Sequence, residues 1–245
     1  MASGMNQIDF HAHILPRCDH GSDGWETSRQ QLKLAREAGV EVICATSHFY
    51  GHHVSVESFL EKRERCYEEL LAHVPMNAPK VLLGAEVLAF EGIDRLPDLK
   101  KLRLQGTKLL LLEMPFNRWS EGLLDSVEAI SDDEDFRIVL AHVDRYDRKA
   151  VEQLFRLNHV KGQVNADNLK RRFGMRYLRE WAREGLIVAV GSDIHGTETG
   201  YVDWLTCQRR YAEDWAAIMK RTNRRLGPLL ETASKQEAEA NGARP

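Results

Sequence analysis

Short apolar runs alternate along the chain with longer stretches in which apolar residues recur every three or four positions. The short runs are rich in Val, Ile and Leu, as strands are, and the longer stretches have the period of amphipathic helices. Seven strands are predicted: Gln7–His11, Val40–Thr46, Val81–Glu86, Leu109–Glu113, Ile138–His142, Gly162–Asn165 and Ile187–Ser192.

The stretches between these strands each predict a helix with one apolar face. Gly39 and Gly185 follow the first and the last of them, at positions where glycine commonly ends a helix. The predicted helices are Gly24–Ala38, Val56–His73, Glu121–Ile130, Arg148–Leu157 and Asn168–Glu184.

Strands separated by helices pair in parallel through right-handed crossovers, which predicts the α/β class. Seven such units without a linker predict a single domain over residues 1–231, folded as a closed or nearly closed β/α barrel. A doubly wound open sheet is the alternative. Residues 232–245 are rich in Ala and polar residues and are expected to form a flexible tail.

Composition narrows the class of protein. The net charge of −3 over 245 residues gives no basic field, so no nucleic-acid partner is expected. No apolar run approaches the roughly 18–20 residues of a membrane span, and the N-terminus does not resemble a signal peptide. The scattered cysteines contain no CxxC pair, which is typical of reduced thiols. A cytoplasmic protein without membrane insertion is expected.

Histidines and acids gather at the carboxyl ends of the predicted strands, which is where β/α barrels place catalytic groups. His11 and His13 are two residues apart, as are Asp193 and His195, so each pair can converge on one point. Imidazole and carboxylate together suit Zn²⁺, Mn²⁺ or Fe ions, and carboxylates can bridge two of them. The candidate ligands at this edge are His11, His13, His48, Glu86, Glu113, His142, Asp193 and His195.

Each of these histidines and acids, taken alone, could have a purely structural role. Their joint occurrence at the ends of six predicted strands argues against that role for the whole set. His52 and His53 lie on the loop after His48, and whether they reach the site is left open. His73 and His159 are expected at the surface.

A cysteine-based phosphatase is excluded, because that chemistry needs an arginine six residues after the nucleophile. The residues at that distance from the four cysteines are Gly24, Tyr50, Ala72 and Glu213.

The ordered motifs resemble the polymerase-and-histidinol-phosphatase (PHP) superfamily. Within it, the chain looks most like the bacterial manganese-dependent protein-tyrosine phosphatases of capsule and exopolysaccharide operons. The motifs that carry the resemblance are Asp9–His13, Asp19–Gly21, Thr46–His48, Gly84–Glu86, Glu113–Phe116, Ala141–Tyr146, Gln163–Asn165 and Ser192–His195.

The resemblance implies a distorted seven-stranded β/α barrel that holds two or three divalent ions, with Mn expected first and Fe or Zn as alternatives. Carried over by position, the ligands of the first ion are His11, His13, Glu86 and Asp193. The ligands of the second are Glu86, Glu113 and His142. The ligands of the third are His20, His48 and His195.

The chain departs from the family pattern at two places. His20 replaces an aspartate, which removes a negative charge and favours Zn²⁺ or Fe²⁺ slightly more. The segment after His195 contains no arginine, although the family places a phosphate-binding arginine there. Arg145 remains at a family phosphate-binding position, and Arg118 or Arg17 are the candidates to replace the missing one.

The expected function is that of a metal-dependent phosphatase acting on the phosphotyrosine tail of a polysaccharide-biosynthesis kinase. Arg145 would bind the phosphate, and Asp193 or His195 would pass a proton to the leaving oxygen. The alternatives are a phosphatase for a small phosphomonoester such as histidinol phosphate, a phosphatase for a nucleic-acid end, and a metal-binding regulator with weak catalysis. The oligomeric state is left open.

Overall fold

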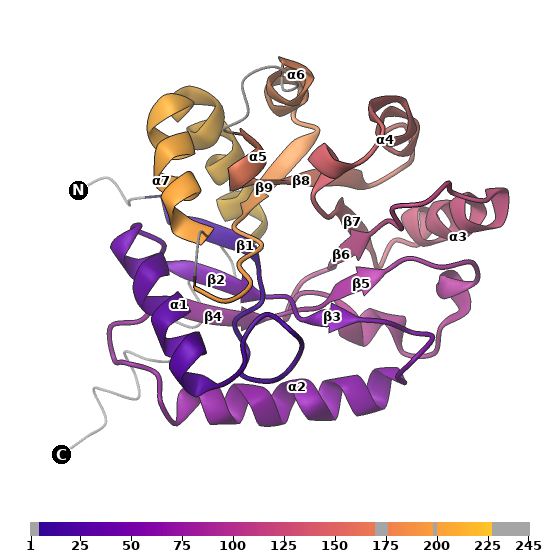
Figure 1. The fold of residues 1–245 in the computed structure, drawn as a ribbon. Helices are drawn as coiled ribbons and strands as arrows, with labels where there is room; N and C mark the ends of the chain where they lie inside the picture. The colour runs from indigo at the N-terminus through magenta and orange to yellow at the C-terminus, as the bar shows by residue number, and fades with distance from the viewer. Residues whose placement is uncertain (1–4, 170–175, 198–199, 227–245) are drawn as a thin grey trace.

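The computed structural model describes residues 5–169, 176–197 and 200–226 (Figure 1). The predicted tail, residues 232–245, and the predicted domain boundary at residue 231 lie outside the described residues. None of the described helices combines the length and the apolar character that a bilayer crossing needs.

The strands form two parallel sheets. The smaller sheet has the order β1-β2-β4, and the larger has the order β3-β5-β6-β7-β8-β9. The smaller sheet comprises β1 (Ile8–Ala12), β2 (Val42–Ala45) and β4 (Lys80–Leu83). The larger comprises β3 (His48–Phe49), β5 (Glu86–Leu88), β6 (Leu109–Glu113), β7 (Arg137–Leu140), β8 (Val160–Asn165) and β9 (Ile187–Gly191).

The two sheets make one distorted barrel, as the sequence predicts. The segment after β9 meets β1 through a parallel bridge between Ala12 and Ile194, and the backbone N–H of Asp193 donates to the carbonyl of His11 at 2.8 Å. The chain passes from β2 to β3 and from β4 to β5 after two-residue breaks. The described strands therefore occupy seven positions around the barrel.

Two predicted strands differ in the structure: Val40–Thr46 is shortened to Val42–Ala45, and Val81–Glu86 is interrupted. The second ends at Leu83, and Glu86 begins β5 in the other sheet. The carbonyl of Gly84, inside the break, accepts a hydrogen bond from the Arg63 guanidinium at 3.0 Å. The break changes the sheet to which the chain belongs, and it moves Glu86 onto the strand beside β6.

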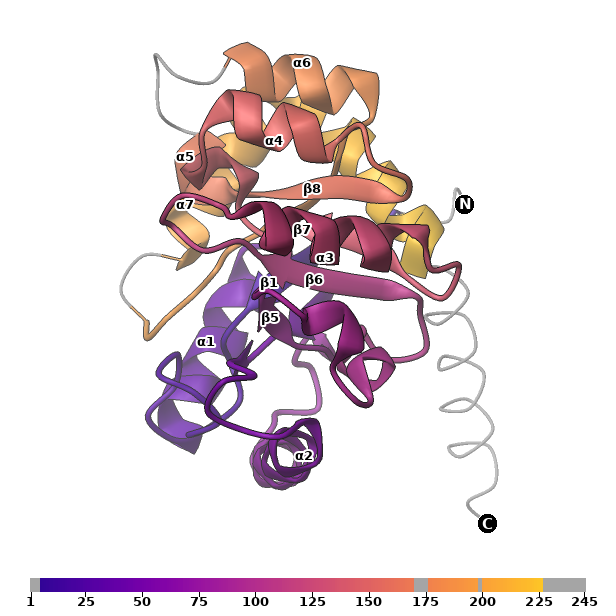
Figure 2. The same ribbon diagram turned by 90° about the vertical axis from the view of Figure 1, so that its right-hand side faces the viewer.

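The helices cover the outside of the barrel. Figure 2 shows α3, α4 and α6 on the outer side of β6, β7 and β8. Serine or aspartate side chains cap the N-termini of α2, α3 and α4 by accepting backbone N–H groups, which accounts for where these helices begin. Their bounds are α1 Trp25–Glu37, α2 Val56–Leu71, α3 Glu121–Asp132, α4 Arg148–Leu154 and α6 Arg176–Glu184.

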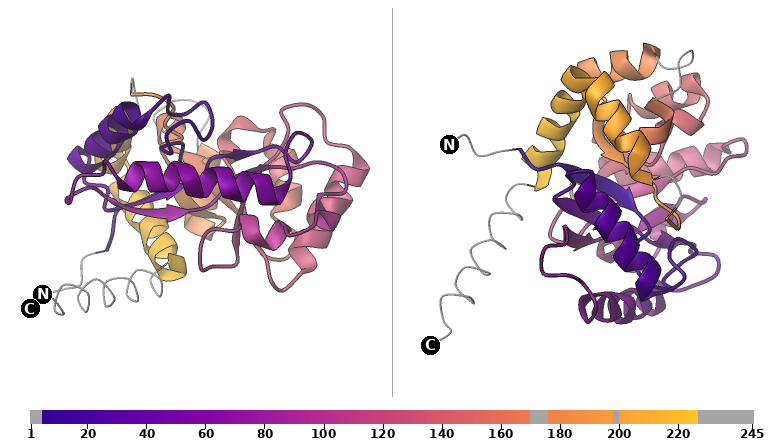
Figure 3. Two further views of the ribbon diagram at one scale, coloured as in Figure 1. Left: turned by 90° about the horizontal axis from the view of Figure 1, so that it is seen from below. Right: turned by 60° about the vertical axis from the view of Figure 1, so that its left-hand side comes forward.

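The short helix α5 (Ala166–Leu169), α7 (Gly200–Arg210) and a helix over residues 212–226 were not predicted as separate elements. The helix over residues 212–226 lies against the first and last strands (Figure 3). The Thr222 hydroxyl donates to the carbonyl of Val188 at 2.7 Å, and the Trp215 indole donates to Gln7 at 3.0 Å. This helix therefore covers the seam at which the barrel closes.

Candidate metal centre

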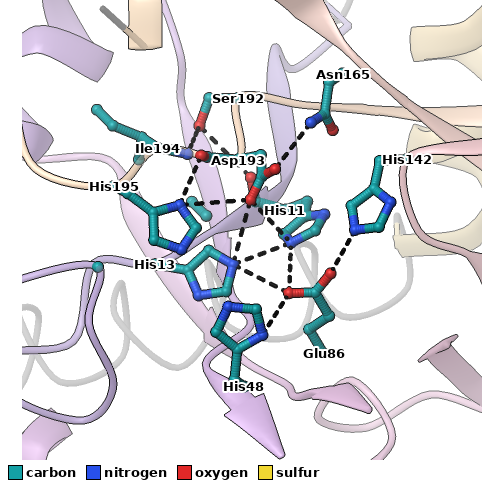
Figure 4. Close-up of polar contacts among 12 residues, drawn as sticks. His11, His13, His48, Glu86, His142, Asn165, Ser192, Asp193, Ile194 and His195 are labelled. Carbon is teal, nitrogen blue, oxygen red and sulfur yellow. Dashed lines mark hydrogen bonds and ion pairs between the residues drawn. The ribbon is translucent and has the colours of Figure 1, made fainter. Parts of the chain in front are cut away.

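The histidines and acids of the successive strand ends converge on one small volume (Figure 4). Nε2 of His11 and Nε2 of His13 lie 3.1 Å apart, and Oε2 of Glu86 lies 3.2 Å from each. Oδ1 of Asp193 lies 3.5 and 3.4 Å from the same two nitrogens. Ligand atoms that share one ion at ~2.1 Å are separated by about 3 to 3.5 Å, so these four side chains fit a single ion.

Glu86 also faces a second group of candidate ligands. Its Oε1 lies 2.9 Å from Nε2 of His142, and that nitrogen lies 3.5 Å from Oε1 of Glu113. The two oxygens of Glu86 thus point to different groups, which is the arrangement of a carboxylate that bridges two metal ions.

A third group contains imidazoles from two loops and from the start of β3. His48 Nδ1 lies 3.0 Å from Glu86 Oε2, and the His195 ring stacks on that of His13 with 4.1 Å between centroids. The exposed His20 ring lies 4.9 Å from that of His48 and 4.5 Å from that of His195. The structure therefore brings His20, His48 and His195 together, although His13 also approaches the last two.

Several buried atoms of the cluster have no hydrogen-bond partner among the described residues. They include Nε2 of His195, and also Oε2 of Glu86 and Nδ1 of His48, which lie 3.0 Å apart without hydrogen-bond geometry. An unsatisfied buried polar atom costs about 1 to 3 kcal/mol, so a native protein seldom keeps several in one place. A divalent cation would use these lone pairs, and the donor set of imidazole and carboxylate fits such an ion.

Two of the candidate ligands have a backbone conformation that favours glycine. His142 has φ 30° and Asp193 has φ 52°. Such strain persists only where the surrounding structure enforces it, and it gathers at functional sites. Glycine is needed beside two other candidate ligands, His11 and His13. A Cβ added to Gly191 would lie 2.4 Å from Cβ of His11, and one added to Gly21 would lie 2.1 Å from Cβ of His13.

Polar residues that the sequence analysis did not assign hold the candidate ligands in place. Gln163 Oε1 accepts the backbone N–H of His142 at 2.7 Å and lies 3.1 Å from Nδ1 of His11. The Asn165 amide donates to Oδ2 of Asp193 at 2.9 Å and accepts from Gln163 at 2.8 Å. Both residues belong to the motif Gln163–Asn165, so the sequence indicated that they matter, but it did not reveal which ligands they contact.

Asp9 holds the base of the cluster together. Its carboxylate accepts the backbone N–H groups of His11 at 3.2 Å and Ser192 at 2.9 Å, and the Tyr201 hydroxyl donates to it at 2.7 Å. Asp9 thereby links β1, the end of β9 and α7. Burial raises the pKa of Asp9 although these hydrogen bonds lower it.

Charge and burial act against each other throughout the cluster. Burial raises the pKa of Glu86, but the nearby His11 and the hydrogen-bonding imidazoles lower it well below its usual range. Burial lowers the pKa of His142, but Glu113 and Glu86 raise it to about 9. Burial and the charge of His13 lower the pKa of His195 to about 4. Glu86 is therefore ionised, and His195 is neutral at pH 7.

The structure places Arg145 at the edge of the cluster, where its Nη2 donates to Oδ2 of Asp193 at 2.6 Å. Arg17 points away and pairs with Glu69 on α2. Arg118 is exposed on the loop after β6 and lines the same cavity as Arg145. Arg118 and Arg17 are the candidates to replace the phosphate-binding arginine that is missing after His195. Of these two, only Arg118 lines a cavity together with Arg145.

The other histidines make contacts outside the cluster. The His52 ring packs on Phe90 with centroids 4.5 Å apart. The His53 ring meets Tyr50 at 6.4 Å. His73 stacks on Trp25, and His159 lies 3.6 Å from Glu134.

A parallel β/α barrel with a cluster of imidazoles and carboxylates at its carboxyl edge defines a class of metal-binding proteins. Residues 7–223 match the model of the family described as capsular polysaccharide synthesis, CpsB/CapC. The chain belongs to this family. No protein with a curated description matches it.

Solved structures agree on the fold. Crystal structures of YwqE from Bacillus subtilis and CpsB from Streptococcus pneumoniae, described as unique metal-dependent tyrosine phosphatases, match with a TM-score of 0.71 and 22% identity over 89% of this chain and 94% of that chain. A beta-aspartyl dipeptidase from Fervidobacterium islandicum matches with a TM-score of 0.52 and 15% identity over 89% of this chain and 72% of that chain.

Proposed function

We propose that this protein is a metal-dependent protein-tyrosine phosphatase that acts on a tyrosine kinase of polysaccharide biosynthesis. The observation that carries the proposal is the position of Glu86, whose two oxygens face separate groups of candidate ligands. Membership of the CpsB/CapC family supports the link to capsular polysaccharide, and the likeness in fold to tyrosine phosphatases supports the reaction.

The proposed ligands follow the contacts within the cluster. His11, His13, Glu86 and Asp193 would hold the first ion, and Glu86, Glu113 and His142 would hold the second. His20, His48 and His195 would hold the third. Manganese is proposed as the native metal, with iron or zinc as alternatives. Divalent ions at these positions would lower the pKa of water and offset the negative charge of a phosphate group.

The chain's own residues would orient the phosphate and the ligands. The Arg145 guanidinium can donate to two phosphate oxygens at once, and its contact with Asp193 fixes it at the edge of the cluster. His195 Nδ1 lies 3.0 Å from the backbone carbonyl of Asp193, and donation there leaves a lone pair on Nε2. That tautomer suits a metal ligand.

Proton delivery to the leaving oxygen bears on the substrate. Asp193 and His195 are the predicted donors, yet both are also proposed metal ligands, and a ligand atom must be free of its proton to bind the ion. In the metal-loaded protein, both would therefore be poor proton donors. A tyrosine phenol, with a pKa of about 10, leaves with little protonation, whereas an alkoxide needs more. The ligand role of both candidate donors therefore favours an aryl ester over an alkyl ester such as histidinol phosphate.

The test combines metal content and turnover in one sample. The protein is purified without chelators, its metal is counted by mass spectrometry, and hydrolysis of a phosphotyrosine peptide and of histidinol phosphate is measured with and without EDTA. Two or three ions per chain and EDTA-sensitive hydrolysis of the peptide are expected. Bound metal without turnover on either ester would favour a regulator, and failure to bind metal would overturn the proposal.

A further inference from the structure

A cavity of about 420 Å³ lies between the loop that follows β6 and the start of α4, and Arg145 lines it. Its volume is within the range of roughly 300 to 1,000 Å³ that small-molecule pockets occupy. Arg145 also contacts Asp193, so one side chain belongs both to the cavity wall and to the candidate metal centre. We call this space, lined by Phe116, Arg118, Trp119, Arg145 and Tyr146 among others, the aromatic cavity.

The walls of the aromatic cavity present ring faces whose polar atoms are already engaged. The Trp119 indole donates to the carbonyl of Pro115 at 2.9 Å, and the Tyr146 hydroxyl accepts the backbone N–H of Met114 at 3.0 Å. The Trp119 and Tyr146 rings meet edge to face, with 5.7 Å between centroids. What remains for a ligand is apolar ring surface.

Phe116 stands between the cavity and the metal centre. Its ring stacks on that of His142 at 6.0 Å with an interplanar angle of 14°, and it lies 5.9 Å from the Tyr146 ring. Its exposed fraction is 68%, and it is the one aromatic residue among the large exposed hydrophobic residues that the structure describes. An apolar ring that stays exposed beside a candidate ligand is available to pack against a bound group.

The charge of the cavity favours an anion at one end. Arg145 and Arg118 line it, and Asp147 is the only carboxylate among its lining residues. The Asp147 carboxylate already caps α4 by accepting the N–H of Ala150 at 3.0 Å. A group that carries phosphate at the Arg145 end and a ring beyond it matches both the charge and the apolar walls.

Resting on the proposed phosphatase function, we infer that the aromatic cavity holds the leaving group of an aryl phosphate. With the phosphate at Arg145 and the cluster, the ring attached to the ester oxygen packs against Phe116 and the Trp119–Tyr146 pair. Phe116 is then a specificity residue that selects aryl over alkyl phosphomonoesters. A small alkyl group gains little from these ring faces.

The experiment compares Phe116→Ala with the wild type on phenyl phosphate and on glycerol phosphate, both proteins carrying the same measured metal content. We expect kcat/KM for phenyl phosphate to fall about five- to tenfold, mainly through KM, because one aromatic contact is lost. The value for glycerol phosphate should change less than twofold. Leu71→Ala, an exposed apolar position on α2, serves as the control and should match the wild type on both esters.

A binding measurement separates this inference from the proposed function. Calorimetry on metal-loaded protein with phenylphosphonate and methylphosphonate needs no turnover, and Phe116→Ala should weaken only the phenyl compound. An equal loss for both compounds, or no loss for either, would overturn the aromatic subsite. A wild type that binds phenylphosphonate through Phe116 yet hydrolyses no phosphomonoester would overturn the proposed function and leave the subsite standing.

Discussion

Nδ1 of His13 donates to Oδ2 of Asp19 at 2.8 Å, and this contact leaves Nε2 of His13 facing Glu86 and Asp193. The same carboxylate oxygen accepts the backbone N–H of His48 at 3.0 Å. Asp19 thus fixes two histidines of the cluster without reaching the centre itself. Carboxylates in this position set the tautomer of a metal-bound histidine and raise its basicity.

Replacing Asp19 with Ala should weaken metal binding by roughly 10- to 100-fold, because His13 loses its orienting acceptor. The affinity is measured by competition with a chromogenic chelator. Asp125→Ala, an exposed carboxylate on α3, is the control. Wild-type affinity in the Asp19 variant would show that His13 is positioned by packing alone.

Glu86→Gln should abolish hydrolysis and reduce the metal content by at least one ion per chain. The amide keeps the size of the side chain but removes the negative charge and places an NH₂ group against imidazole nitrogens. Circular dichroism should show that the fold persists. Glu128→Gln, at an exposed position on α3, should retain full metal content and activity. Unchanged turnover in Glu86→Gln would refute the bridging role.

Arg145→Lys should lower kcat/KM for a phosphotyrosine peptide about 10- to 100-fold while the metal content stays constant. Lysine keeps the positive charge but cannot donate to two phosphate oxygens in one plane. The effect is measured by steady-state kinetics of peptide hydrolysis and by the inhibition constant of inorganic phosphate. Arg156→Lys, on the exposed segment after α4, is the matched control. Equal kinetics for both variants would remove Arg145 from phosphate binding.

Metal affinity should rise with pH, and the part of this rise that is due to His142 should end near pH 9. In the metal-free protein, Glu113 and Glu86 raise the pKa of His142 to about 9 against the effect of burial, so the imidazole is protonated below that pH. An incoming ion must displace this proton, and its affinity therefore falls as the pH falls. Calorimetric titrations at pH 7 in buffers of different ionisation enthalpy count the protons released. Metal binding to His142→Gln should release fewer protons than metal binding to the wild type. An unchanged number would contradict the assignment of His142 as a metal ligand.

Trp204→Ala should lower the free energy of unfolding by roughly 3 to 5 kcal/mol. The Trp204 side chain is fully buried on α7 and packs edge to face on Trp215, with 4.7 Å between centroids. Urea denaturation measures the loss. Val202→Ala lies two residues away with 68% of its surface exposed, and it should change stability by less than about 0.5 kcal/mol. Similar values for both variants would show that α7 contributes little to the core.

The sequence by itself determined the class of fold and the chemical identity of the cluster. Strands that alternate with helices must run parallel, so their carboxyl ends share one edge and bring His11, Glu86 and Asp193 near one another. The residue types at those ends then fix the kind of ligand that the edge can hold. Local pattern and chain order carry this information, which is why no structure was needed for it.

Only the tertiary structure decided where strands break and how the ligands are held. The change of sheet between Leu83 and Glu86, and the left-handed backbone of Asp193, depend on contacts between distant segments. Gln163 contacts His11, which is 152 residues away in the chain. The helix over residues 212–226 has buried residues at helical spacing, among them Trp215, Ile218 and Met219, but only the structure places it across the barrel seam. Hydrogen bonds over such separations leave no regular spacing in the sequence, so geometry alone reveals them.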